Sequence, residues 1–97
     1  MGSANRVKPK KLPEKLKMIR NRLDLTFEEL IERLDCPQIP LYRASISQYE
    51  NGKREPPLLV LLRYARTANV NLEMLVDDEL ELPEKLLASN KKSFSRK

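Results

Sequence analysis

Apolar residues recur at helical spacing from Leu12 onward, and this period constrains the fold of the chain more than any other sequence feature. The first members of the series fall at positions i, i+4, i+7 and i+11, on one face of a helix: Leu12, Leu16, Ile19 and Leu23. The whole chain contains only two glycines against 34% charged residues, which favours helices over a β-sandwich or barrel. We therefore predict an all-α domain whose first helix starts near Leu12.

Start and stop signals define the second and third helices. In Thr26-Phe27-Glu28-Glu29, the threonine can accept a hydrogen bond from the amide three residues on while Glu29 reaches back, which is the capping-box pattern. Two prolines in the following segment interrupt the helical period. The third helix is predicted to run from about Arg43 to Glu50 and to end at Asn51-Gly52, a left-handed C-terminal signal.

Two further helices complete the predicted domain. A fourth is expected over about Leu58–Ala68, and a fifth, capped by Asn71, over about Leu72–Val76. The chain then divides into three regions: a disordered basic arm at 1–11, a helical domain at 12–80 and a C-terminal segment at 81–97, which begins with a turn or short helix and ends in a basic tail.

The net charge of +5 is concentrated at the two ends of the chain. Residues 1–11 and 90–97 each carry four basic residues and no acidic one, which leaves −3 for residues 12–89. Six acidic residues fall within 73–84. Charge alone therefore favours a polyanionic partner and a pair of solubilising tails about equally.

Composition argues against several classes of protein. The chain has no histidine, which removes the commonest general base and the commonest metal ligand. Cys36 is the single cysteine, so no internal disulfide and no thiolate metal cluster can form. No window approaches the roughly 18 apolar residues of a membrane span, and the N-terminus lacks a hydrophobic signal core. We therefore expect a cytoplasmic protein that is not an enzyme, uses no metal or cofactor and has no membrane partner.

Three segments carry a more specific pattern: IRNRLDLTFEELIERL, ASISQYENGKREP and LLRYARTANVNLEML. In the block Ile46–Pro56, an isoleucine, a glutamate four residues on, a glycine and a basic pair close to a proline fall in step. With these segments, Ile19–Leu75 resembles the Cro/cI-type helix-turn-helix family, also called the XRE family. The resemblance implies an all-α, five-helix, lambda-repressor-like bundle that binds DNA through a helix-turn-helix.

In this family the third helix lies in the major groove and presents its N-terminal residues to base edges. The base-contacting residues that the resemblance implies are Arg43, Ala44, Ser47 and Gln48. Arg43 can donate two hydrogen bonds to a guanine, and Gln48 can pair with an adenine, while Ile46 and Tyr49 anchor the helix to the core. Outside this motif, the same polar residues would be interpreted as a solvated helix surface.

The resemblance also implies phosphate contacts and one structural ion pair. The implied phosphate-contacting residues are Thr26, Asn51, Lys53 and Arg54. Phosphate contacts orient a domain on DNA without selecting sequence. The turn at 51–54 is equally a helix cap followed by a solvated loop, and the two interpretations do not exclude each other. Arg20 and Glu50 occupy positions that form an ion pair in the family, linking the first helix to the end of the third.

Two features depart from the family pattern. The helix-turn-helix usually has a turn of about three or four residues, whereas Asp35–Tyr42 stands between the second and third helices, roughly five residues longer. Within this insertion, Ile39 and Tyr42 are candidates to contact DNA or a partner, and tolerated decoration is the alternative. The position after the cap of the second helix, often a DNA-contacting glutamine in the family, is Phe27.

The fourth helix contains more apolar residues than the family pattern requires. That pattern assigns five residues to its inward face: Leu58, Leu61, Tyr64, Ala65 and Ala68. Leu59 and Val60 are then surplus, and surplus exposed apolar residues often mark an interface. We consider a homodimer interface, as expected for paired half-sites in DNA, and burial beneath Leu82, Leu86 and Leu87 of the C-terminal segment as alternatives.

The leading hypothesis is a sequence-specific transcriptional regulator, acting as a homodimeric repressor on double-stranded DNA. The rival hypothesis is an antitoxin-like or complex-forming module that uses the same fold to bind a protein partner. In that case the acidic segment 73–84 and the leucine-rich part of the fourth helix would form the working surface.

Overall fold

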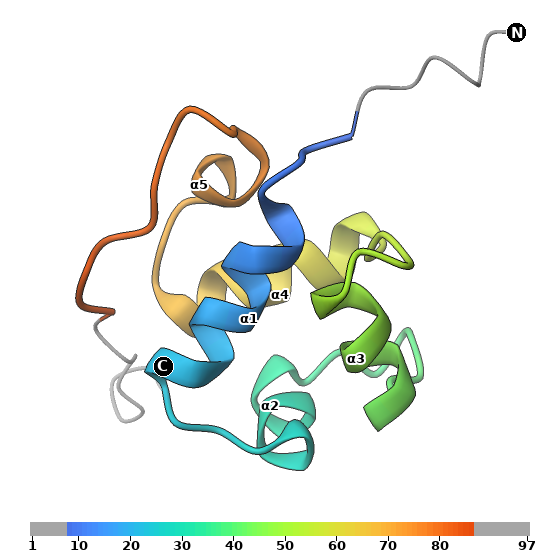
Figure 1. Cartoon of the computed structure of the whole chain (residues 1–97). Coiled ribbons are helices and arrows are strands. Elements are labelled where there is room, and N and C mark those ends of the chain that lie inside the picture. The colour runs from blue at the N-terminus through green and yellow to red at the C-terminus, as the bar shows by residue number, and fades with distance from the viewer. Residues whose placement is uncertain (1–7, 87–97) are drawn as a thin grey trace, which may run out of the picture.

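The computed structural model describes residues 8–86. Within that range the chain folds into helices without a strand (Figure 1), as the sequence predicts. The five helices are α1 (Leu12–Arg22), α2 (Phe27–Leu34), α3 (Arg43–Glu50), α4 (Leu58–Ala68) and α5 (Leu72–Val76). Residues 77–86 form turns and bends. The predictions for most of the basic arm, for Leu87 and for the basic tail lie outside the described residues.

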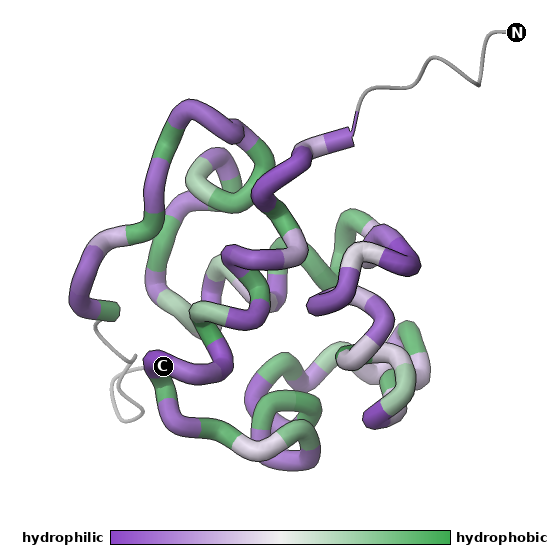
Figure 2. Tube along the Cα trace, viewed as in Figure 1, coloured by the Kyte–Doolittle hydropathy of each residue, from purple (hydrophilic) through white to green (hydrophobic). Residues whose placement is uncertain are grey.

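One apolar core joins the helices. α1 packs against α3 and α5, α4 packs against α2 and α5, and α2 also contacts α3. Each helix contributes at least one fully buried side chain, as in Leu16, Ile19, Leu30, Leu34, Ile46, Tyr49, Val60, Tyr64 and Leu75. Figure 2 shows hydrophobic and hydrophilic residues alternating along the helices, as expected where one face of each helix is turned to a shared core.

The capping box predicted for α2 is present. The Thr26 hydroxyl oxygen accepts a hydrogen bond from the Glu29 amide at 3.1 Å, and the Thr26 amide donates to the Glu29 carboxylate at 2.9 Å. These two bonds satisfy backbone donors that the first turn of a helix cannot pair internally. The start of α2 is therefore fixed by its own sequence.

The buried face of α4 agrees with the prediction at Leu61, Tyr64, Ala65 and Ala68 and differs at its first residue. Val60 is fully buried, which agrees with burial rather than with an exposed interface, and Leu58 is 70% exposed, although the family pattern assigns it to the inward face. The buried face of α4 runs through Val60, Leu61, Tyr64, Ala65, Thr67 and Ala68. On a 3.6-residue period Val60 lies about 60° from the centre of that face and Leu58 about 100° from it. Leu59, which is 45% exposed, points away from the core.

The segment after α5 closes the domain against the start of α1. Lys15 is buried, and its ammonium donates to the Met74 and Asp77 carbonyls at 2.6 and 2.9 Å. The Asp78 carboxylate accepts hydrogen bonds from the backbone amides of Lys10 and Lys11 at 2.9 and 3.0 Å. α1 has no side-chain cap from its own N-cap residue, Lys11, and the backbone amide of that residue is paired instead with a carboxylate 67 positions away.

Candidate nucleic-acid interface

α3 presents a polar face to solvent. Arg43, Ala44 and Gln48 are exposed and Ser47 is half-exposed. The other residues of the helix are buried: Ser45, Ile46, Tyr49 and Glu50. The four residues that the resemblance implies as base contacts therefore lie together on the outer side of α3, which forms one edge of the bundle (Figure 1).

The end of α3 is shaped by Gly52. Its φ of +74° places it in the left-handed region, where a residue without a Cβ is least strained. The Gly52 amide donates to the Tyr49 carbonyl at 3.3 Å, and the Lys53 amide donates to the Gln48 carbonyl at 2.9 Å. This pair of bonds is a Schellman motif, which ends a helix and turns the chain sharply. A Cβ on Gly52 would also lie 3.3 Å from Cγ of Pro13 in α1.

The basic turn after this motif is open to solvent. Asn51, Lys53 and Arg54 are exposed, and the Asn51 amide group donates to the Ser47 hydroxyl at 3.3 Å. Lys8, from the part of the basic arm that the structure describes, lines the same shallow cleft as Arg54. Three cationic side chains thus gather at the C-terminal end of α3, where they can act on a phosphate backbone.

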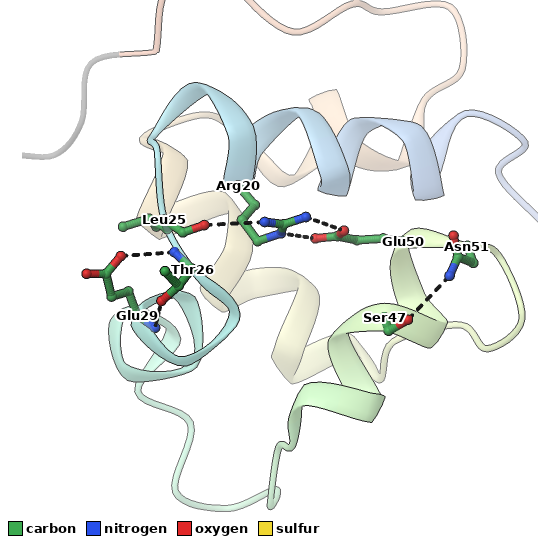
Figure 3. A network of polar contacts seen from close by, with 7 residues as sticks. All are labelled: Arg20, Leu25, Thr26, Glu29, Ser47, Glu50 and Asn51. Atoms are coloured by element: carbon green, nitrogen blue, oxygen red, sulfur yellow. Dashed lines mark hydrogen bonds and ion pairs between the residues drawn. The ribbon is translucent and has the colours of Figure 1, made fainter.

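The Arg20–Glu50 ion pair lies between α1 and the end of α3 (Figure 3). Arg20 Nε is 2.7 Å from Glu50 Oε2, Nη2 is 3.0 Å from Oε1, and Nη1 donates to the Leu25 carbonyl at 3.3 Å. The side chains are only 18% and 4% exposed. The hydrogen bond to Glu50 raises the pKa of Arg20, although burial opposes this effect. The pair therefore fixes the C-terminal end of α3 to α1.

Thr26 lies at the start of α2, on the far side of the Arg20–Glu50 pair from Asn51 (Figure 3). It is exposed, and its hydroxyl oxygen accepts the capping bond from Glu29. A hydroxyl that accepts one hydrogen bond can still donate its own proton to a phosphate oxygen. Thr26 and the basic turn thus flank the ion pair that orients α3.

Phe27 is an apolar residue at the position after the cap of α2, where the family often has a DNA-contacting glutamine. It is half-buried and packs against the core. Its ring lies 4.5 Å from the Arg20 guanidinium carbon and 5.5 Å from that of Arg43. Arg43 Nη1 also lies 3.3 Å from Glu28 Oε2. This contact could not be predicted from the sequence pattern, because the insertion between α2 and α3 determines which residues of the two helices meet.

The insertion 35–42 folds back onto the domain. It begins at Asp35, whose φ of 46° ends α2 in the left-handed region. Cys36 is buried, and Ile39 and Leu41 are partly buried against the core. Tyr42 remains 64% exposed beside the first residue of α3. The apolar residues of the insertion therefore anchor it, while its last residue adds an aromatic ring to the exposed surface.

Among residues 8–86 there is no group of three or more potential metal-binding side chains. No helix in that part of the chain is long and apolar enough to cross a membrane.

Comparison with known proteins identifies a family. Residues 16–75, more than half of the chain, match the family model described as Helix-turn-helix. Comparisons with curated proteins and with solved structures give no match. The matched range contains α2, α3 and α4 and most of α1 and α5, including the ion pair and the basic turn. The chain therefore belongs to the XRE-type helix-turn-helix family of DNA-binding domains.

Proposed function

We propose that the protein is a sequence-specific regulator of transcription that inserts α3 into the major groove of double-stranded DNA and acts as a repressor. The observation that carries this proposal is the exposed polar face of α3, backed by buried residues and followed directly by a basic turn. A helix can read base edges only when its outer face is free of bulky core contacts. A repressor needs no more than stable occupation of its site.

The outer face of α3 suits base recognition. Arg43 and Gln48 lie about 140° apart around the helix axis on a 3.6-residue period. Ala44 and Ser47 occupy the arc between them and are small, so the helix can approach the floor of the groove closely. Arg43 would donate two hydrogen bonds to a guanine and Gln48 would pair with an adenine.

The phosphate contacts in this proposal come from both sides of α3. Thr26 would contact one stretch of backbone, and Asn51, Lys53 and Arg54 would contact another. Such contacts set the register of the helix in the groove and make binding depend on salt. Lys8 adds a further cation beside Arg54.

We further propose that the protein binds as a homodimer. Leu58 and Leu59 are 70% and 45% exposed at the start of α4, a few residues after the basic turn. Paired half-sites lie about 34–36 Å apart along the DNA, and a two-fold contact through these leucines would have to hold two copies of α3 at that spacing. Val60, which the sequence analysis paired with Leu59, is buried and is not part of this surface.

Selection of binding sequences from a random DNA pool by the purified protein tests the proposal directly. We expect enrichment of a motif with two related half-sites, and loss of that enrichment with Gln48→Ala. A protein that is folded by circular dichroism but enriches no sequence would contradict the proposal.

A protein-interaction module is the second candidate function. The exposed apolar side chains of Leu58, Leu59 and Val76 favour it, because exposed apolar surface often marks a site of protein–protein interaction. Co-purification of a stoichiometric partner by a protein that enriches no DNA sequence would support this function instead.

A further inference from the structure

Phe27 and Glu28, the first two residues of α2, hold the side chain of Arg43, and we call these two residues the Arg43 seat. The Arg43 guanidinium carbon lies 5.5 Å from the centre of the Phe27 ring, and Nη1 lies 3.3 Å from the Glu28 carboxylate. Arginine over an aromatic face and arginine beside a carboxylate are both attractive contacts. The seat therefore gives an exposed arginine a defined position.

The seat is supported from within the domain. Phe27 packs against the core, and the Arg20 guanidinium lies 4.5 Å from the same ring. Arg20 is itself held by Glu50 at the opposite end of α3. One connected set of contacts thus links the two ends of α3 through α1 and the start of α2. Glu28 and Arg43 form its solvent-facing end, with side chains 61% and 68% exposed.

We propose that the Arg43 seat restrains Arg43 from pairing with the phosphates of arbitrary DNA, so that this residue acts mainly in sequence discrimination. The proposal rests on the proposed function, in which α3 enters the major groove. If Arg43 moved to a phosphate, the Glu28 carboxylate would be left unpaired beside a polyanion. The resulting repulsion opposes the favourable energy of the arginine–phosphate contact. A guanine offers two directed hydrogen bonds, worth about 5- to 150-fold in affinity over a wrong base, and can outweigh that loss.

Neutralising the carboxylate of the seat tests this restraint. Glu28→Gln is compared with Glu32→Gln, which removes the same charge one turn further along α2, from another exposed position. Affinity for the selected duplex and for a random duplex is measured over a range of salt concentrations. We expect Glu28→Gln to raise random-DNA affinity about 2- to 5-fold more than the control, the scale of an exposed ion pair. The log–log salt slope on random DNA should steepen by up to about 0.9, one additional phosphate.

A second series tests the aromatic part of the seat. Phe27→Leu removes the ring face but keeps an apolar side chain, whereas Phe27→Tyr keeps the face. We expect Phe27→Leu to lower the ratio of specific to random affinity and Phe27→Tyr to preserve it. Thermal melting monitors folding in both variants. If Phe27→Leu does not fold, the Glu28 series alone decides.

Two results would overturn the proposal. One is the same random-DNA affinity and salt slope for Glu28→Gln and Glu32→Gln. The other is an undiminished effect of Glu28→Gln in an Arg43→Ala background, which would mean that the carboxylate acts without Arg43. Gln48→Ala separates this failure from failure of the proposed function. If Gln48→Ala lowers the ratio of specific to random affinity while the two glutamate variants match, only the seat is refuted; if the wild type prefers no sequence at all, both proposals are refuted.

Discussion

Replacing Arg20 with methionine removes the partner of a carboxylate that is almost completely buried. Glu50 is 4% exposed at its side chain, and both of its oxygens lie within 3.0 Å of the guanidinium. Methionine keeps much of the length and the apolar stem of arginine, so the change tests charge and hydrogen bonding more than volume. The variant also loses the hydrogen bond to the Leu25 carbonyl.

The magnitude follows from the burial of the pair. Removing one partner of a buried ion pair costs about 3–5 kcal/mol, whereas an exposed pair contributes about 0–1 kcal/mol. Since the Arg20 side chain retains 18% of its exposure, we expect the lower end of the buried range, about 3 kcal/mol. For a domain of this size that corresponds to a fall in Tm of roughly 12–24 °C.

Urea unfolding of four proteins measures the effect: the wild type, Arg20→Met, Glu50→Leu and the double variant. The double variant should recover most of the loss, because no unpaired charge remains buried, which gives a coupling free energy of about 2 kcal/mol or more. Either of two results would refute this reasoning: a fall of less than about 1 kcal/mol in the unfolding free energy of Arg20→Met, or losses that add in the double variant. Both results are expected of an ion pair that is exposed to solvent.

Three further outcomes are expected. Gln48→Ala should weaken binding to the best site by about 1–3 kcal/mol in a titration and have much less effect on random DNA, whereas neutralising the basic pair after α3 should weaken both by similar factors; equal losses for Gln48→Ala on both DNAs would contradict base reading. Leu59→Glu should convert a dimer into a folded monomer by light scattering, and an unchanged mass would place the interface elsewhere. Hydrogen bonds from the backbone amides of Lys11, the larger contributor, and Lys10 lower the pKa of Asp78. The stabilisation of the folded state by the Asp78 carboxylate is therefore present above the ordinary aspartate pKa of about 3.9, and it is lost as pH falls through the lower pKa of the folded state. The difference in Tm between wild type and Asp78→Ala should accordingly become smaller in acid. A difference that does not change with pH would show that the charge of the Asp78 carboxylate does not stabilise the fold.

Local signals made much of the fold predictable. The bounds of α3, α4 and α5 agree with the predicted ranges, and the capping box at Thr26 and the left-handed turn at Gly52 are both present. Each of these features depends on residues within a few positions of one another, which a single sequence displays directly. The outward face of α3 followed because Ile46 and Tyr49 determine which side of an eight-residue helix is buried.

The features that could not be predicted depend on packing between segments that are distant in the sequence, or on a run of residues without a clear period. Leu58–Leu62 is a continuous apolar run with no period to choose its inward face, so Leu58 was assigned to the buried face and the position of Val60 stayed open. The contact between Glu28 and Arg43 depends on how the insertion folds back. Lys15 reads as a surface lysine, because its carbonyl acceptors lie about 60 residues further along the chain.

The hydrogen bonds from Lys10 and Lys11 to Asp78 also bear on how this domain can be combined with other polypeptides. They bring the entry and exit of the helical unit side by side, within the reach of one aspartate side chain. A domain with adjacent ends tolerates insertion into another protein and circular permutation better than one whose ends are far apart. Direct linkage of these ends, with new ends opened in the exposed part of the 35–42 insertion, would keep every helix intact but would omit residues 79–86, whose Leu82 is buried in the core. The same adjacency means that tension on a domain fused after Asp78 would reach the first turn of α1 before it reached α3.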